Sequence, residues 1–405
     1  MTKGFSPVVA SAQLKNIKTQ PQPISMPELE GGLLNYFDDV PDPRVDRTKH
    51  HLLKDILVIA LLAIIAGGNG WEDMENYGIS KQTWLKQFLE LPNGLPHHDT
   101  FRRVFEKLDP KILEQKLTQW VQKFLGSVVD QVIPIDGKSL RGSYDRNQGK
   151  KNLHLVTAWA SENRLVLGQV KVDSHSHEIT AIPALLELID VTGAIVTMDT
   201  MGTQTEIIKQ IVHKKANYVV CLKSNHPTLY NQVKSWFEIQ LSRQFAGVKM
   251  TDYRQVEKGH NRIEKRRVWA IPVSEFGGLY NQDKWAGLQT VVIVERFRQE
   301  WNGTSHEVQF YLSSLTVDAQ KHGFIIREHW SIENKEHWVL DVTFEEDKSR
   351  VRAFNSPRNL AVLRRMALNA LNQETTLSRS LRQKRNRAAM SEEYMMLILK
   401  SLCQA

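Results

Sequence analysis

Residues 132–143 read VIPIDGKSLRGS, and the expected class of fold follows from this stretch. Its apolar, β-branched first half is typical of a buried strand, which is predicted to end at Asp136. A loop of small residues that carries Lys138 and Arg141 is predicted to follow. Because Asp-Gly is a strong turn signal, one interpretation of Asp136 is a turn-former. The other is a metal ligand at the carboxyl end of a sheet strand, where open α/β folds place their chemistry.

A second stretch with the same layout, GAIVTMDTMGTQ, covers residues 193–204. Asp199 ends its apolar run, and Gly202 and a predicted helix follow. Taken alone, each aspartate would more often be a turn or helix-cap residue than a metal ligand. Two acids in this setting on two predicted strands favour a shared site for Mg²⁺, which prefers oxygen ligands.

A third acid is found in IREHWSIENKEHWVLDVTFEEDKSR, residues 326–350. On a helix His329, Glu333 and His337 recur every four residues and share one face. Glu333 is therefore a candidate third carboxylate, beside an apolar stripe of tryptophans. An amphipathic helix whose charges face water explains the same pattern.

The chain has 405 residues, a formal net charge of +8 and two cysteines. This length predicts two or three domains, and the positive charge favours a polyanionic partner. Two distant cysteines exclude a disulfide framework and favour a reducing compartment. The uncharged apolar run 56–68 is shorter than the ~20 residues of a spanning helix, and no signal peptide is recognised. We expect a soluble protein with no membrane partner.

The pattern of periodicity changes along the chain. Residues 1–30 are predicted to be a flexible lead-in and residues 31–128 an all-helical N-terminal domain. Residues 129–372 begin with three β-rich runs, read as an antiparallel meander, and continue with alternating helices and strands, which predicts a mixed α/β sheet. Within this domain about 225–315 is predicted to be a β-rich insertion. A basic tail and a helix are expected over 373–405.

Three motifs resemble those of bacterial insertion-sequence DDE transposases, nearest the H-repeat-associated group. They are DGKSLRGS (136–143), VTMDTMGTQTEI (196–207) and REHWSIENKEHWVLDVTFEED (327–347), and LPHHDTFRRVFEKLDP (95–110) and EKGHNRIEKRR (257–267) are further similar segments. The resemblance runs in order from about residue 30 to 372. It implies a ribonuclease H-like mixed sheet with flanking helices and a β-rich insertion before the last catalytic helix.

The resemblance also implies the chemistry. Carried over by motif, the catalytic and metal-binding acids fall on Asp136, Asp199 and Glu333, which would hold Mg²⁺, with Mn²⁺ as a substitute. The implied reaction is two-metal cleavage of DNA at the ends of an insertion sequence, followed by joining of the 3′-OH ends to target DNA. The implied partners are double-stranded DNA (terminal inverted repeats and target) and a second copy of the chain, and the location is the bacterial cytoplasm, at the nucleoid.

Basic residues near these motifs are candidate DNA contacts. Lys138 and Arg141 follow the first acid, and EKGHNRIEKRR forms a cationic hairpin. Its candidate side chains are His260, Arg262, Lys265, Arg266 and Arg267. The wider class has an arginine four residues before its glutamate, whereas this chain has a histidine there, so Arg327 or His329 is expected to contact phosphate instead. Ordinary solvated cations are the alternative for all of them.

Two other motifs are set aside. The GKS of IDGKSL lacks the earlier glycine of a nucleotide-binding P-loop. DSHSHE (173–178) contains His175, His177 and Glu178, but no further ligand spacing supports a zinc site, and an exposed loop before a helix is expected. Two other functions stay open: a non-catalytic DNA-binding protein derived from a transposase, and another metal-dependent phosphoesterase.

Overall fold

The computed structural model describes residues 24–403 except 30, 31, 33, 145–150, 174–176, 260, 261 and 302. The helices are α1 (Met26–Leu29), α2 (Leu53–Ile65), α3 (Trp71–Leu85), α4 (His98–Lys107), α5 (Pro110–Phe124), α6 (Glu178–Leu188), α7 (Thr205–His213), α8 (Pro227–Ser242), α9 (Ala319–His329), α10 (Trp338–Val342), α11 (Ser356–Gln373), α12 (Leu381–Met390) and α13 (Glu392–Cys403). The strands are β1 (Val132–Leu140), β2 (Leu153–Ala160), β3 (Leu165–Lys171), β4 (Ile195–Met198), β5 (Asn217–Leu222), β6 (Thr251–Gly259), β7 (Arg262–Pro272), β8 (Thr290–Glu300) and β9 (Gly303–Ser313).

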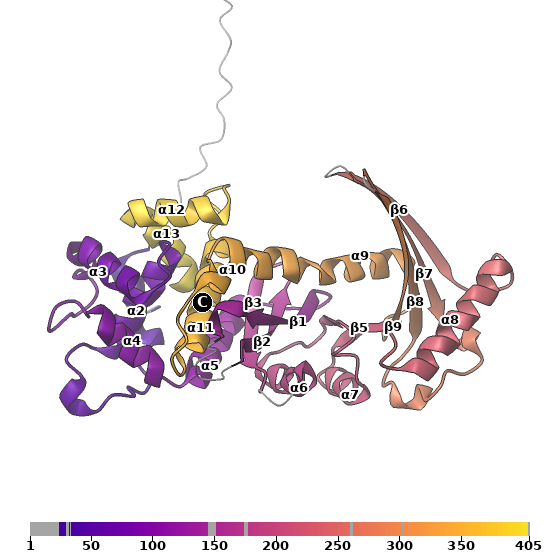
Figure 1. Ribbon diagram of the computed structural model, residues 1–405, viewed down its shortest axis with the longest axis horizontal. Helices are drawn as coiled ribbons and strands as arrows, with labels where there is room; N and C mark the ends of the chain where they lie inside the picture. The colour runs from indigo at the N-terminus through magenta and orange to yellow at the C-terminus, as the bar shows by residue number, and fades with distance from the viewer. Residues whose placement is uncertain are drawn as a thin grey trace, which may run out of the picture.

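One mixed sheet of nine strands, in the order β3-β2-β1-β4-β5-β9-β8-β7-β6, forms the centre of the structure. The strands β1 to β3 pair antiparallel, which confirms the predicted meander, and β4 and β5 continue parallel to β1. Helix α6 packs on β2 and β3, whereas α9 packs on β1 and β4, and Figure 1 shows them on opposite faces of the sheet. The predicted ribonuclease H-like fold is confirmed.

Strand β1 does not end at Asp136. Its parallel pairing with β4 stops at Ile135, which lies opposite Met198, but its antiparallel pairing with β2 continues to Leu140. The prediction that Lys138 lies in an exit loop is therefore wrong. Asp136 instead lies where β1 separates from β4, so it keeps one strand neighbour and gains an open side.

The inserted segment begins with a helix. Helix α8 precedes the strands β6 to β9, so the reading of this region as largely β missed one helix of 16 residues. The four strands form an antiparallel meander. Strand β9 pairs antiparallel with β5, which joins this meander to the other five strands of the sheet. The long, curved hairpins of this insertion rise beyond the end of α9 in Figure 1.

The N-terminal helices share one apolar core with the sheet. Every residue of α2 except Lys54 is buried, because α3, α11 and α12 pack around it. Helix α3 consists of two helical segments joined by a kink at Lys81, whose backbone angles are not helical. None of the described helices is long and apolar enough to cross a bilayer.

The C-terminal segment is packed against the rest of the protein. The predicted basic tail is instead helix α12, in which Arg385 is buried. Its guanidinium donates to the carbonyl of Ile64 in α2 at 2.8 Å and stacks over the Phe344 ring at 4.2 Å. Helix α11 lies between α2 and β3, and Asn369 closes the edge of β3 by hydrogen bonds to both backbone groups of Val166.

Candidate active site

Two aspartates lie side by side where the parallel pairing of β1 with β4 stops. Asp136 follows Ile135 on β1, and Asp199 follows the paired Met198 on β4. Backbone amides fix one oxygen of each carboxylate: the N–H of Gly137 donates to Asp136 Oδ1 at 2.8 Å, and the N–H of Met201 donates to Asp199 Oδ1 at 2.8 Å. Both carboxylates are thereby oriented before any ligand arrives.

Glu333 approaches from the face of the sheet covered by α9. A π-helical turn, Glu333–His337, joins α9 to α10, so the predicted single helical face is interrupted. Such turns are frequent at functional sites. Glu333 is exposed, and the preceding turn is anchored by His329, whose Nδ1 lies 3.0 Å from the Thr197 hydroxyl of β4.

The carboxylates influence one another's ionisation. Burial raises the pKa of Asp136 from 3.8 to about 7, and the negative charges of Glu178, Asp199 and Glu333 add to this effect. Burial, followed by the charge of Glu178, also raises the pKa of Asp199. The three predicted acids therefore share one electrostatic environment, together with a fourth carboxylate, Glu178, from the motif that the sequence analysis set aside.

The raised pKa of Asp136 predicts a stability effect that depends on pH. A folded-state pKa of about 7 lies above the ordinary 3.8, so stability is lost as pH rises from about 4 to about 7. In metal-free protein Asp136→Asn should therefore stabilise more at pH 8 than at pH 5, by roughly 1–3 kcal/mol, as measured by urea unfolding. Asp190→Asn is the control, because hydrogen bonds from Thr192 lower the pKa of Asp190. An equal gain at both pH values for Asp136→Asn would contradict the shift.

The motif that contains Glu178 was predicted to be an exposed loop before a helix, but the side chain of Glu178 itself is only partly exposed. Glu178 is the first residue of α6, and its carboxylate lies 2.7 Å from His154 Nε2 on β2. The other ring nitrogen of His154 lies 2.7 Å from the Ser139 hydroxyl. Neither His154 nor this contact was predicted. His177 is exposed, and His175 lies outside the described residues.

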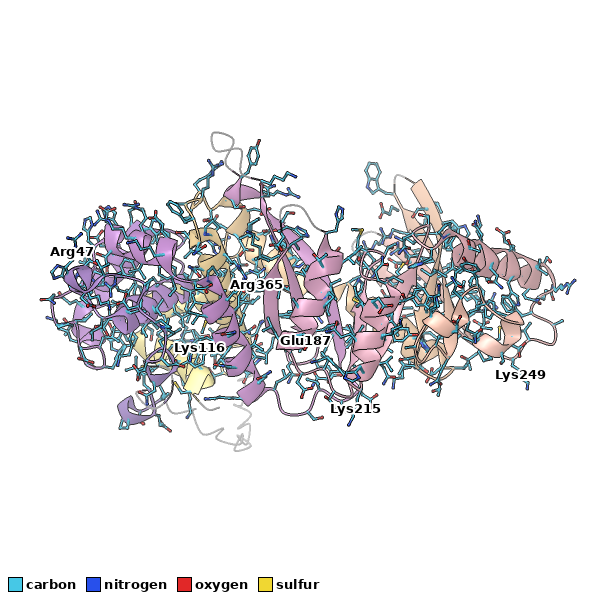
Figure 2. The ribbon with its side chains drawn as sticks, turned by 90° about the horizontal axis from the view of Figure 1, so that it is seen from below. Arg47, Lys116, Glu187, Lys215, Lys249 and Arg365 are labelled. Carbon is cyan, nitrogen blue, oxygen red and sulfur yellow. The ribbon has the colours of Figure 1, made fainter. Side chains whose placement is uncertain are left out.

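Behind the site lies a chain of buried charges. His337 Nδ1 is 3.7 Å from Asp136 Oδ2, and the neighbouring Glu336 is fully buried. Glu336 accepts a hydrogen bond from the Thr157 hydroxyl at 3.0 Å and pairs with Arg365 Nε at 3.3 Å. Arg365 also binds Glu346, at 3.2 Å. In Figure 2 Arg365 lies in the middle of the molecule, between the N-terminal helices and the sheet. These charges hold the π-helical turn against β1 and α11.

The four predicted phosphate contacts close to the acids occupy different settings. Lys138 is buried and pairs with Asp341 at 2.5 Å and with Glu346 at 3.7 Å, so its ammonium belongs to the internal charge chain. Burial lowers the pKa of His329 to about 4, which leaves its ring neutral at pH 7. Arg141 is 83% exposed and only loosely paired, whereas Arg327 pairs with Glu257 of β6.

The basic hairpin forms as predicted, with Gly259 and Arg262 paired at its turn. Lys265 and Arg262 are both exposed, and Arg262 also has a loose contact with Glu264 at 3.9 Å. The other two arginines have close internal partners: Arg266 pairs with Glu264, and Arg267 pairs with Asp252 at 2.6 Å and covers the Trp269 ring. His260 lies outside the described residues.

A separate group of metal-binding side chains lies in the N-terminal helices. Within the described residues, Glu75, His97 and His98 form the one group of three whose ligand atoms all lie within 4.8 Å of each other. His98 Nδ1 is 2.7 Å from Glu75, so these residues satisfy one another at the start of α4. The acids at the sheet are not part of such a closely spaced group among the described residues.

The mixed α/β fold is the one that the resemblance to DDE transposases implied. Residues 128–370 match the family described as "Transposase DDE domain", and residues 34–121 match the one described as "DDE_Tnp_1-associated". The chain therefore belongs to the DDE transposase family.

Two relatives from Escherichia coli are similar over most of the chain. "Putative transposase YncI" of strain O157:H7 is 35% identical, with 91% of this chain and 94% of the relative covered. "H repeat-associated putative transposase YhhI" of strain K12 is 33% identical, with 91% and 97% covered. The piggyBac transposase synaptic complex with hairpin DNA aligns with a TM-score of 0.39 and 11% identity, over 94% of this chain and 80% of that one.

Proposed function

We propose that this protein cleaves DNA at the ends of an insertion sequence and joins the freed 3′-OH ends to target DNA. The observation that supports the proposal is the proximity of three acids: Asp136 on β1, Asp199 after β4 and Glu333 in the π-helical turn. Membership of the DDE transposase family supports the choice of DNA as the substrate.

The acids fit a divalent-metal centre. Carboxylate oxygens are the donors that Mg²⁺ and Mn²⁺ prefer. Repulsion between neighbouring carboxylates helps raise the pKa of Asp136. A bound cation would offset this repulsion with its positive charge. When bound, two such ions would lower the pKa of the attacking water or hydroxyl and stabilise the leaving oxygen. Asp136, Asp199 and Glu333 would hold them.

The protein's own residues keep this site in place. Amide donors orient the two aspartates, so little reorganisation is needed on loading. His329 is neutral and bonded to Thr197, and thus serves to fix the helix rather than to bind phosphate. Arg141 and Lys265 are the exposed cations that we assign to the DNA backbone.

The test is a gel assay with labelled DNA that carries the inverted repeats flanking the gene. We expect Mg²⁺-dependent strand cleavage, followed by joined products when target DNA is added. Binding without cleavage would instead favour a non-catalytic DNA-binding protein. Neither binding nor cleavage, with hydrolysis of small phosphodiesters, would favour another phosphoesterase.

Lys265→Ala should weaken DNA binding evenly across sequences. A phosphate contact carries affinity without sequence reading, and losing one should reduce the slope of log affinity against log salt by about 0.9. The measurement is fluorescence anisotropy with duplex DNA at several salt concentrations. Lys249→Ala is the matched control, since Lys249 is exposed at the far end of the insertion, near α8 (Figure 2). Equal salt slopes for the two variants would contradict the assignment of the hairpin to DNA.

A further inference from the structure

Glu178 reaches the site from the face of the sheet opposite to Glu333. Gly137 and Ser139 lie on one face of β1, whereas Asp136 and Lys138 lie on the other, because side chains alternate along a strand. The carboxylate of Glu178 lies directly over Gly137: a Cβ added there would overlap it. Glu178 is therefore next to Asp136 along β1, and glycine is the residue that leaves it room.

The direction of the Glu178 side chain is not explained by helix capping. An acid in the first turn of a helix commonly serves that helix's own amides. The hydrogen bond of Glu178 runs instead across to His154 on β2, 2.7 Å away. His154 is itself fixed by Ser139, which lies directly opposite it in the β1–β2 pair. The carboxylate is thus held over the sheet, towards the two aspartates.

The charge of Glu178 acts on both aspartates. Among the charged groups it is the largest contributor to the raised pKa of Asp136 and also of Asp199. Its side chain is 19% exposed, so water screens this repulsion only in part. Carboxylates that bind metal ions are commonly oriented by a hydrogen bond from a residue that does not itself bind the metal. His154 stands in this relation to Glu178.

We propose that Glu178 is a fourth carboxylate of the metal centre, held by His154 over Gly137. This inference rests on the proposed function, because it assigns a further ligand to the same centre. In this arrangement Asp136 and Asp199 lie at the rim of the sheet, and Glu178 and Glu333 reach them from its two faces. His154 is a positioning residue, which acts through Glu178.

The experiment measures Mn²⁺ binding to the full-length chain by isothermal titration calorimetry and, separately, the melting temperature of the metal-free protein. Glu178→Gln should weaken Mn²⁺ binding about tenfold or more, and His154→Gln should weaken it in the same direction. The metal-free melting temperature of Glu178→Gln should be equal to or above that of the wild type, because the amide removes a repulsion. Glu187→Gln, on the outer surface of the same helix (Figure 2), should change neither quantity.

Asp199→Asn separates this inference from the proposed function. If Asp199→Asn loses Mn²⁺ binding while Glu178→Gln binds like the wild type, Glu178 is not a ligand and the three-acid centre stands. If Mn²⁺ binding is absent in the wild type or unaffected in both variants, the metal centre and this inference fail together. A marked fall in the metal-free melting temperature of Glu178→Gln would show a structural role and would also overturn the inference.

Discussion

Asp199→Asn is expected to lower the rate of DNA strand cleavage by on the order of 10³-fold or more while leaving DNA binding close to that of the wild type. Several kcal/mol of transition-state stabilisation depend on the charge that holds the metal, and each ~1.4 kcal/mol is a factor of ten in rate. Asparagine keeps the shape of the side chain and can still accept the amide hydrogen of Met201. A loss of activity would then result from the missing charge, because the backbone after β4 would keep its structure.

The cleavage assay uses labelled end DNA with Mg²⁺, and gel shift measures binding on the same samples. Asp190→Asn is the matched control, since Asp190 is an exposed acid shortly before β4. Its carboxylate accepts a hydrogen bond from the backbone N–H of Thr192. It should cleave at the wild-type rate. Cleavage by Asp199→Asn at more than about a tenth of the wild-type rate, a cost below ~1.4 kcal/mol, would remove Asp199 from the centre.

Arg365→Met is expected to give the largest loss of stability of any single substitution considered for this protein. It removes the shared partner of Glu336 and Glu346, whose side chains are completely buried. Breaking a buried ion pair by removing one partner costs about 3–5 kcal/mol, because the remaining charge stays desolvated. Arg364 also lies beside Glu346 but at 4.0 Å, so it compensates only weakly.

Urea unfolding, followed by circular dichroism, measures this loss. Lys209→Met is the control: Lys209 forms an exposed pair with Glu206, and such pairs contribute about 0.5 kcal/mol or less. A loss below ~1 kcal/mol for Arg365→Met would mean that the buried chain of charges does not hold the π-helical turn, because a broken buried pair costs several kcal/mol.

The acids that end or follow apolar strands could be found from the sequence because their signal is local. Asp136 and Asp199 each follow a run of β-branched residues, and parallel pairing then places them side by side. The antiparallel meander of β1 to β3 also follows from short runs with clear periodicity. Helical spacing offered Glu333 as a candidate, and the family resemblance assigned its role. The shared helical face behind that spacing is interrupted by the π-helical turn.

The supporting residues could not be found in this way, because their contacts join distant parts of the chain. The proposed role of Glu178 depends on its position over Gly137 and beside His154. Neither contact produces a recognisable spacing in the sequence. Lys138 looked like a surface cation in a loop, but the continued pairing of β1 with β2 places it in the interior, against Asp341. The burial of Arg385 in α12 likewise depends on the packing of α12 on α2.

The central claim is that Asp136, Asp199 and Glu333 together hold divalent ions. Anomalous scattering from crystals of the protein soaked in Mn²⁺ tests it most directly. We expect two anomalous peaks about 3.5–4 Å apart, contacted by carboxylate oxygens of all three residues. Peaks confined to Glu75, His97 and His98, with none between β1, β4 and the π-helical turn, would contradict it.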